Sequence, residues 1–330
     1  MTARSGSSGD PFERLVGFGE PTLDNEQVTE LGGADRDVAD RLWRALGFPD
    51  VPEGELAFTD EDARALRLAT EGLAQLTGDR REQALELMLH EARVISASLA
   101  NLAEIELDTI GALIELGLRR ELLAEAIDRG IERSDFGWLI LYVLRRELGG
   151  ALRRRAPADA GGGLPRQRLA VGFVDLVGFT ELTHQLEAVE LGRLLGRFES
   201  LAFDVVTEAG GRVVKLIGDE AMLICPQAPQ AVRAALEILD RSSAVDIPPA
   251  RSGIASGDLV VQGGDYFGSA VNLASRIVDR APSGAVVVDE QIARSVQNEP
   301  DLVLEKRPDT SLKGIGTVSL WRASARKHDR

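Results

Sequence analysis

The sequence is poor in cysteine and in long apolar runs. It has one cysteine, Cys225, which excludes an intramolecular disulfide framework and fits a reducing compartment. The longest apolar stretch near its middle, Trp138 to Leu144, is far too short to cross a bilayer. Met1 to Asp10 lacks the apolar core of a secretory signal. These absences predict a cytoplasmic protein with no membrane span.

Positive charge is also scarce in the first half of the chain. Of 330 residues, the first 150 carry 30 acidic and 16 basic side chains, a net charge of −14 out of −15 for the whole chain. Such an acidic segment is a poor partner for nucleic acid or an anionic membrane. The remaining 180 residues are almost neutral, which leaves room there for a local anion-binding site.

The length suffices for two domains, and the predicted secondary structure differs between the two halves of the chain. Residues 1–10 are small and polar and predict a disordered tail. Residues 11–148 follow a helical pattern with few strand signals, which predicts an all-α domain in which Thr59 begins a helix. Residues 149–168, rich in glycine and arginine, predict a flexible linker, although helix could continue through Arg155 if Gly149 and Gly150 are tolerated.

Residues 169–325 alternate between strand and helix signals, which predicts an α+β domain. The expected strands and helices are, in order, Val171–Val177 (strand), Leu182–Ala209 (helix), Arg212–Ile217 and Ala221–Cys225 (strands), Ala228–Asp240 (helix), Ala250–Gln262 (strand), Ser269–Val278 (helix), Ala285–Val288 (strand), Gln291–Gln297 (helix), and closing strands within Leu302–Trp321.

Two aspartates stand at strand ends. Asp175 lies near the end of the apolar run Val171–Val177, where an unpaired charge is costly. Asp219 lies in a tight turn between two expected strands. Two carboxylates so placed suit a divalent cation that bridges a triphosphate.

A third pattern is Asp265 to Arg276. Asn272 and Arg276 are four residues apart, so they project from one face of the expected helix. An amide and a guanidinium there could hold a ribose oxygen and a charged phosphate. Taken alone, Asn272 and Arg276 are explained more simply as surface residues of a helix. Taken alone, Asp175 is explained more simply as a helix cap.

Together, these ordered patterns resemble the class III adenylyl cyclase catalytic domain over Leu169 to Ala323. The resemblance implies a ferredoxin-like fold, an antiparallel-rich sheet with flanking helices. It implies that Asp175, Asp219 and the backbone carbonyl of Leu176 bind two Mg²⁺ or Mn²⁺ ions per active site. One ion would lower the pKa of the attacking 3′-hydroxyl, and the other would neutralise the leaving triphosphate.

The resemblance assigns the remaining roles as well. Lys215 and Asp265 correspond to the pair that reads the adenine edge, Asn272 orients the ribose, and Arg276 stabilises charge on the reacting phosphate. Lys313 resembles the lysine that contacts the terminal phosphates. Because such sites form between two catalytic domains and this chain has one, the implied enzyme is a homodimer.

The expected reaction is conversion of ATP to cyclic AMP. Asp265 can accept a hydrogen bond from the adenine amino group and Lys215 can donate to N1, whereas guanine reverses this polarity. The alternatives are a guanylyl cyclase, a catalytically silent cyclase fold that serves as sensor or scaffold, and a DNA-binding regulator, which the acidic charge disfavours.

The first domain, including Arg41 to Asp50, resembles the autoinhibitory regulatory domain of pH-sensing actinobacterial, notably mycobacterial, adenylyl cyclases. A helix-to-coil change around residues 149–163 could then switch the orientation of the catalytic domains. His184 and His90 are candidate pH-responsive residues, although a solvated helix position explains each more simply. The arginines at 153–155 could bind to the acidic N-terminal domain. Cys225 is predicted to be a small buried apolar residue.

Overall fold

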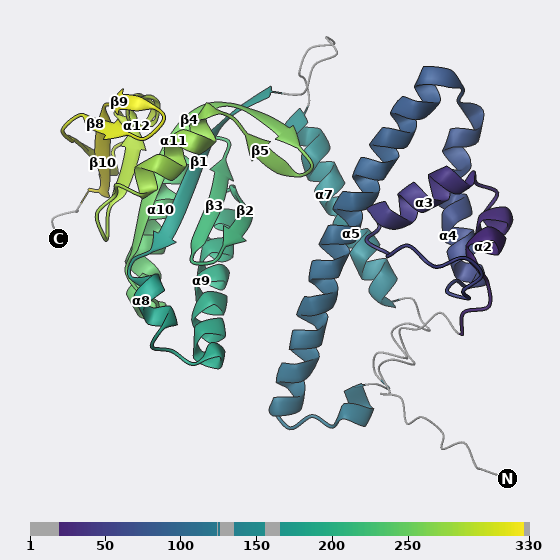
Figure 1. Ribbon diagram of the computed structural model, residues 1–330. Coiled ribbons are helices and arrows are strands. Elements are labelled where there is room, and N and C mark those ends of the chain that lie inside the picture. Colours follow the sequence, from purple (N-terminus) through teal and green to yellow (C-terminus); the bar gives the residue numbers. More distant parts are fainter. Residues whose placement is uncertain (1–19, 124, 126–134, 156–165, 327–330) are drawn as a thin grey trace. The chain divides into compact units, whose positions relative to one another are not determined.

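The computed structural model describes residues 20–123, 125, 135–155 and 166–326 (Figure 1). The expected disordered tail at residues 1–10 and the middle of the expected linker, residues 156–165, lie outside this part of the chain. Backbone contacts divide the chain into two units, residues 1–154 and 155–330. No helix among the described residues is both long enough and apolar enough to cross a bilayer.

The N-terminal unit is helical. Its elements are α2 (Asn25–Gly32), α3 (Arg36–Ala45), α4 (Asp60–Thr70), the short 3₁₀ helix η1 (Glu71–Gln75), α5 (Gly78–Glu115) and α7 (Asp135–Arg155). Asp24 begins α2 and Thr59 begins α4, and each side chain accepts a hydrogen bond from the backbone three residues on. The expectation that Thr59 caps a helix is therefore confirmed.

A small apolar core holds α2 to α5 together. Val28, Leu42, Leu66 and Leu85 are almost fully buried in it, and Trp43 packs its ring near that of Phe58. Only the N-terminal part of α5 takes part, because its last buried residue is Ala92.

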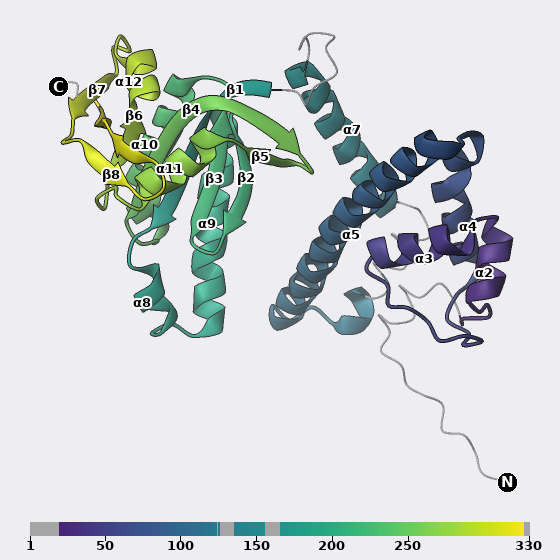
Figure 2. The same ribbon diagram turned by 45° about the horizontal axis from the view of Figure 1, so that its top comes forward.

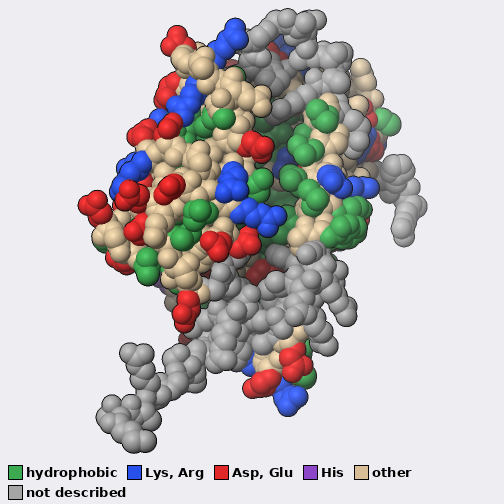
Figure 3. Space-filling model, turned by 90° about the vertical axis from the view of Figure 1, so that its right-hand side faces the viewer, with side chains coloured by type: hydrophobic (Ala, Val, Ile, Leu, Met, Phe, Trp, Pro, Cys, Tyr) green, Lys and Arg blue, Asp and Glu red, His purple; other side chains and the backbone are tan. Residues whose placement is uncertain are grey.

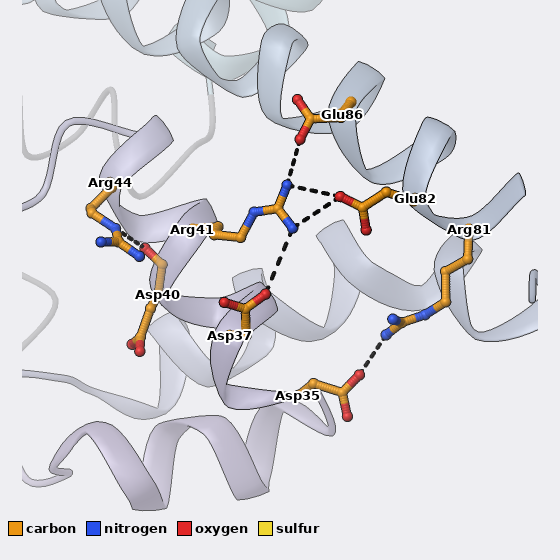
Figure 4. Close-up of polar contacts among 8 residues, drawn as sticks. All are labelled: Asp35, Asp37, Asp40, Arg41, Arg44, Arg81, Glu82 and Glu86. Atoms are coloured by element: carbon orange, nitrogen blue, oxygen red, sulfur yellow. Dashed lines mark hydrogen bonds and ion pairs between the residues drawn. The ribbon is translucent and has the colours of Figure 1, made fainter. Parts of the chain in front are cut away.

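Ion pairs join α3 to α5 beside this core (Figure 4). The guanidinium of Arg41 lies 2.5 Å from Glu86, 3.2 Å from Glu82 and 3.6 Å from Asp37. Exposed pairs of this kind contribute little individually, but two carboxylates of α5 on one guanidinium of α3 help to orient the two helices, and Asp37 pairs with Arg41 within α3.

Figure 3 shows acidic and basic side chains interspersed over one face of the molecule.

The expected linker is shorter in the structure. Helix α7 continues through Gly149 and Gly150 to Arg155, and the first strand of the next unit begins at Arg166. Each glycine costs a helix about 1 kcal/mol relative to alanine. The flanking leucines, alanine and arginines are good helix formers, which offsets this cost.

The C-terminal unit is built on one large sheet (Figures 1 and 2). Its strands are β1 (Arg166–Leu176), β2 (Arg212–Ile217), β3 (Glu220–Cys225), β4 (Ala250–Gln262), β5 (Asp265–Phe267), β6 (Val286–Asp289), β7 (Leu302–Lys306) and β10 (Leu320–Ala325), and the hairpin of β8 (Thr310–Leu312) and β9 (Gly316–Val318) stands apart. Its helices are α8 (Phe179–Thr183), α9 (Ala188–Glu208), α10 (Ala228–Arg241), η2 (Ser242–Val245), α11 (Ser269–Val278) and α12 (Glu290–Val296).

The strand order identifies the fold. The sheet runs β2-β3-β1-β4-β6-β10-β7, and β5 pairs with β4. Strands β2, β3, β1 and β4 are antiparallel neighbours, and α9 and α10 make the crossovers, which is the ferredoxin-like βαββαβ arrangement. The predicted α+β, ferredoxin-like fold with an all-α region before it is confirmed.

Helices cover both faces of this sheet. One apolar core lies under α9, α10 and α12, and a second lies under α11. Alternate residues of β1 point into different cores: Val174 into the first, and Phe173 into the second. The helix expected over Leu182–Ala209 is broken, because α8 ends at Thr183 and a new helix begins at Ala188 with a capping box from Glu187.

Candidate active site

The end of β1 and the β2–β3 hairpin bring Asp175 and Asp219 together. Asp175 is the last but one residue of β1 and pairs in register with Glu220, the first residue of β3. Gly218 turns the hairpin with a positive φ of 63°, where glycine is favoured. The backbone N–H of Leu176 donates to the carbonyl of Asp219 at 3.2 Å. The two aspartates thus sit on backbone segments that are bonded to each other.

Arg251 faces this corner from β4. It pairs in register with Asp175, and its Nε lies 2.7 Å from Oδ2 of that carboxylate. The Asp175 side chain is largely buried, so the guanidinium neutralises a charge that would otherwise be costly there. Arg251 stands outside the motifs that predict the site from the sequence. Its partner becomes evident only from the register of two strands 76 residues apart.

Negative charge is in excess at this corner. Burial raises the pKa of Asp219, and the neighbouring Asp175 raises it further, while a backbone hydrogen bond and Arg251 act in the opposite sense. Burial, followed by the charges of Asp175, Asp279 and Asp219, raises the pKa of Glu220 to about 7. Arg251 therefore lies among three carboxyl groups, those of Asp175, Asp219 and Glu220, an environment that stabilises an added cation.

The donor set fits a divalent cation. The carboxylates of Asp175 and Asp219 and the backbone carbonyl of Leu176 are oxygen donors of the kind that Mg²⁺ and Mn²⁺ prefer. Among the described residues, no cluster of three or more histidine, cysteine or acidic side chains is arranged to hold a metal. A cation at this corner would therefore rely on the two aspartates and on main-chain or substrate oxygens.

Lys215 and Asp265 form an ion pair between β2 and β5, fifty residues apart in the sequence. Both side chains are partly exposed. The other oxygen of Asp265 accepts from the backbone N–H of Tyr266 at 2.8 Å, which fixes the carboxylate. The structure therefore brings together the two residues expected to read a base.

Asn272 and Arg276 lie on the exposed side of α11. The other side of the helix packs on β4 so closely that a Cβ on Gly253 would lie 2.3 Å from the backbone nitrogen of Val278. Arg276 is near Asp279, at 3.4 Å. The tight contact with the sheet fixes the direction in which both side chains project.

The other candidates lie apart. Lys313 is exposed at the tip of the β8–β9 hairpin. His184 follows α8 and His90 lies on α5, and both are exposed. Cys225 is fully buried, and burial raises the pKa of its thiol to about 12, which makes it inert.

The candidate residues fall into separate groups within one chain. Asp175 and Asp219 share one corner, Lys215 pairs with Asp265, and Asn272 and Arg276 project from α11. Over the described residues, no hydrogen bond or ion pair in the structure joins one of these groups to another.

Known proteins with similar sequences show which family has this arrangement of residues. Residues 165–324 match the family profile of the adenylate and guanylate cyclase catalytic domain. An adenylate cyclase from Streptomyces coelicolor is 34% identical over 82% of this chain and 70% of its own length. One from Glutamicibacter nicotianae is 31% identical over 95% of this chain and 81% of its own.

The chain belongs to the class III adenylate cyclase family. The predictions of the family and of the enzyme class are thereby confirmed. A further relative, the pH-sensitive adenylate cyclase of Mycobacterium tuberculosis, is 31% identical over 87% of this chain and 73% of its own length. Among solved structures, the adenylyl cyclase CyaB from P. aeruginosa aligns with 51% of this cyclase and 99% of its own chain, at 22% identity and a TM-score of 0.45.

Proposed function

We propose that this enzyme converts ATP to 3′,5′-cyclic AMP and pyrophosphate in an active site shared between two copies of the chain. The observation that carries the proposal is the meeting of Asp175 and Asp219, held by the hydrogen bond from Leu176 to the Asp219 carbonyl. The adenylate cyclases among the relatives support ATP as the substrate.

Asp175, Asp219 and the carbonyl of Leu176 would hold Mg²⁺ or Mn²⁺. Two such ions per site, when bound, lower the pKa of the 3′-hydroxyl and neutralise the triphosphate. The excess of carboxylates around Arg251 favours binding of a cation. Arg251 orients Asp175 through its 2.7 Å contact, so the carboxylate is already directed in the free protein.

The reaction needs no protein nucleophile. The 3′-oxygen forms a bond to the α-phosphorus, its proton leaves to solvent, and the bond from the α-phosphorus to the bridging oxygen breaks, so that pyrophosphate departs with the electron pair. Arg276 would donate to the α-phosphate oxygens as their charge grows, and Asn272 would hold the ribose. Lys313 would contact the terminal phosphates.

Lys215 and Asp265 would read the base. When ATP enters, their mutual ion pair opens, so that Asp265 accepts from the adenine amino group and Lys215 donates to N1. Guanine offers an acceptor and a donor in the reverse order, which leaves both side chains unpaired. Each buried mismatch costs roughly 1–3 kcal/mol, and this favours ATP.

The separation of the candidate groups supports a homodimer. One copy would supply Asp175 and Asp219, and the other Lys215, Asp265, Asn272 and Arg276. A two-fold axis then creates two equivalent sites, because each copy presents both sets.

The N-terminal helical unit would regulate this assembly, and the pH-sensitive relative supports a regulatory role. The unit has its own core, separate from the two cores of the cyclase unit. Deleting residues 1–160 should change specific activity several-fold. Equal activity of the truncated and full chains would reject regulation.

The direct test is turnover of ATP and of GTP by the purified chain with Mg²⁺ or Mn²⁺, with product identified by chromatography. We expect cyclic AMP from ATP and little product from GTP. Asp175→Asn should abolish turnover while circular dichroism stays unchanged. Preferential use of GTP would make the chain a guanylyl cyclase, and no product from either nucleotide would make it a silent cyclase fold.

A further inference from the structure

Helix α5 carries one continuous apolar stripe that is covered over only part of its length. At steps of three and four residues the stripe runs from Leu85 through Leu89, Ala92, Ile95 and Leu99. Leu85, Leu89 and Ala92 are 1–7% exposed against the unit's core, whereas Ile95 and Leu99 are 46% and 48% exposed. The apolar stripe of α5 therefore continues beyond Ala92, where its contact with the core ends.

Helix α7 has the same feature in a stronger form. Eight of its large apolar side chains, between Trp138 and Leu152, are 43–69% exposed. Trp138 and Tyr142 stack on each other, with ring centroids 5.4 Å apart, yet both remain open to solvent. A helix that is apolar on several sides is normally buried by neighbours.

The uncovered area suits a stable protein interface. An aromatic side chain buries about 150–250 Å², so half-exposed side chains of that size or smaller offer roughly 50–100 Å² each, and the eight on α7 present on the order of 400–800 Å². The upper end of this range is about the share that each partner contributes to an interface of standard size. Patches this large on a soluble protein mark interaction sites.

The charges beside these two apolar surfaces are complementary. Residues 94–118 hold four acidic side chains and no basic one. Glu106 lies on the stripe itself, seven residues after Leu99, with no ion pair to any described residue. Helix α7 carries five arginines against two acidic residues, and Arg145 and Arg146 are exposed.

We propose that the uncovered stripe of α5 and the apolar surface of α7 form one interface with the same elements of a second copy of this chain, α5 of one copy against α7 of the other. This rests on the proposed function in one respect, that the enzyme works as a pair of chains. The pairing covers both surfaces in both copies and sets the acidic part of α5 beside the arginines of α7. An anionic lipid surface is the poorer occupant, because it repels the acidic stripe.

Sedimentation equilibrium of the full chain tests this, and it needs no catalytic activity. Ile95→Asp with Leu99→Asp should raise the dimer dissociation constant about tenfold or more, as loss of central anchors does. The matched control is Leu87→Asp, because Leu87 is a leucine of α5 that is 71% exposed and lies off the stripe. If both proteins dimerise as the wild type does, the interface is wrong.

Two further variants keep the test decisive if the aspartates unfold the helix. Ile95→Ala with Leu99→Ala preserves helix propensity and should still weaken the dimer relative to Leu87→Ala. Charge reversal tests the pairing: Glu106→Arg should weaken dimerisation, and so should Arg145→Glu with Arg146→Glu. Combining the reversals should restore it, and an absence of restoration would contradict the α5–α7 pairing.

The result separates this inference from the proposed function. If the stripe variants dissociate but cyclic AMP is never formed, the interface stands and the proposed activity fails. If cyclic AMP is formed and dimerisation ignores the stripe, the interface fails alone. A wild-type chain that stays monomeric and sediments with vesicles containing anionic lipid would overturn the second copy as the occupant.

Discussion

Arg251 donates its Nε–H to the Asp175 carboxylate at 2.7 Å across the β1–β4 pair. Asp175 is the carboxylate on which the proposed metal site depends, and it is held by a residue that the motifs do not include. The contact does two things: it neutralises a largely buried charge, and it fixes where the carboxylate points.

The first prediction concerns this contact. Arg251→Ala should lower kcat/KM by about ten- to a hundredfold, since one oriented charge-assisted hydrogen bond is worth about 1.5–3 kcal/mol. The concentration of Mg²⁺ or Mn²⁺ at half-maximal rate should also change, which a merely structural role would not produce. Arg251→Lys, which keeps the charge, should be less impaired. Unaltered metal dependence in Arg251→Ala would contradict a positioning role.

Base selection gives the second prediction. Asp265→Asn turns a pure acceptor into a group that also donates, so the preference for ATP over GTP should fall about tenfold, the effect of roughly one hydrogen bond. The ratio of kcat/KM for the two nucleotides measures it. Asp258→Asn, an exposed aspartate on the neighbouring β4, is the matched control and should leave the ratio unchanged.

The third prediction concerns the close packing of α11 against Gly253 of β4. A methyl group on Gly253 would lie 2.3 Å from the Val278 nitrogen and 2.6 Å from the Ala274 carbonyl oxygen. Both are backbone atoms of α11, so they cannot move without shifting the helix. Gly253→Ala should therefore destabilise the cyclase unit by about 1–3 kcal/mol in urea unfolding. It should also reduce activity, because α11 carries Asn272 and Arg276. Gly192→Ala, in open space on α9, should be neutral or stabilising.

Asp289 gives a prediction about pH. Its carboxylate begins α12 by accepting from the Ile292 N–H at 2.8 Å, and burial raises its pKa although backbone hydrogen bonds oppose the shift. An acid with a raised folded pKa is stabilised when protonated, so its contribution to stability is lost as pH rises through that pKa. Unfolding free energies between pH 4 and 7, taken as wild type minus Asp289→Asn, should therefore decrease with pH.

A difference that grows or stays flat over that range would contradict the raised pKa. Asp289→Ala supplies the control for the cap itself. It should be about 1 kcal/mol less stable than Asp289→Asn at every pH in this range, because neither replacement titrates and asparagine still caps the helix.

Much of the cyclase unit was predictable because its residues obey local rules. The strand expected over Ala250–Gln262 and the helix expected over Ser269–Val278, which follows Gly268, are reproduced by the structure at the same residues. The break after Thr183 was missed, since no glycine or proline marks it and the following cap is a glutamate. At Gly149 and Gly150 the sequence left both linker and helix open, and the structure has helix, because good helix formers on both sides outweigh the cost of the glycines.

The site divides in the same way. Asp175, Asp219, Lys215 and Asp265 stand in short ordered motifs, and the structure brings them together as two pairs. Arg251 and Glu220 act through strand register and burial, which are properties of the folded chain.

The shared active site is tested most directly by mixing two inactive chains, Asp175→Ala and Arg276→Ala. In a mixed dimer, one site receives both damaged parts and the other receives the intact Asp175 of one copy with the intact Arg276 of its partner. Random pairing should then restore about a quarter of wild-type activity. A mixture as inactive as its components, in chains shown to exchange partners, would contradict a site built from two copies.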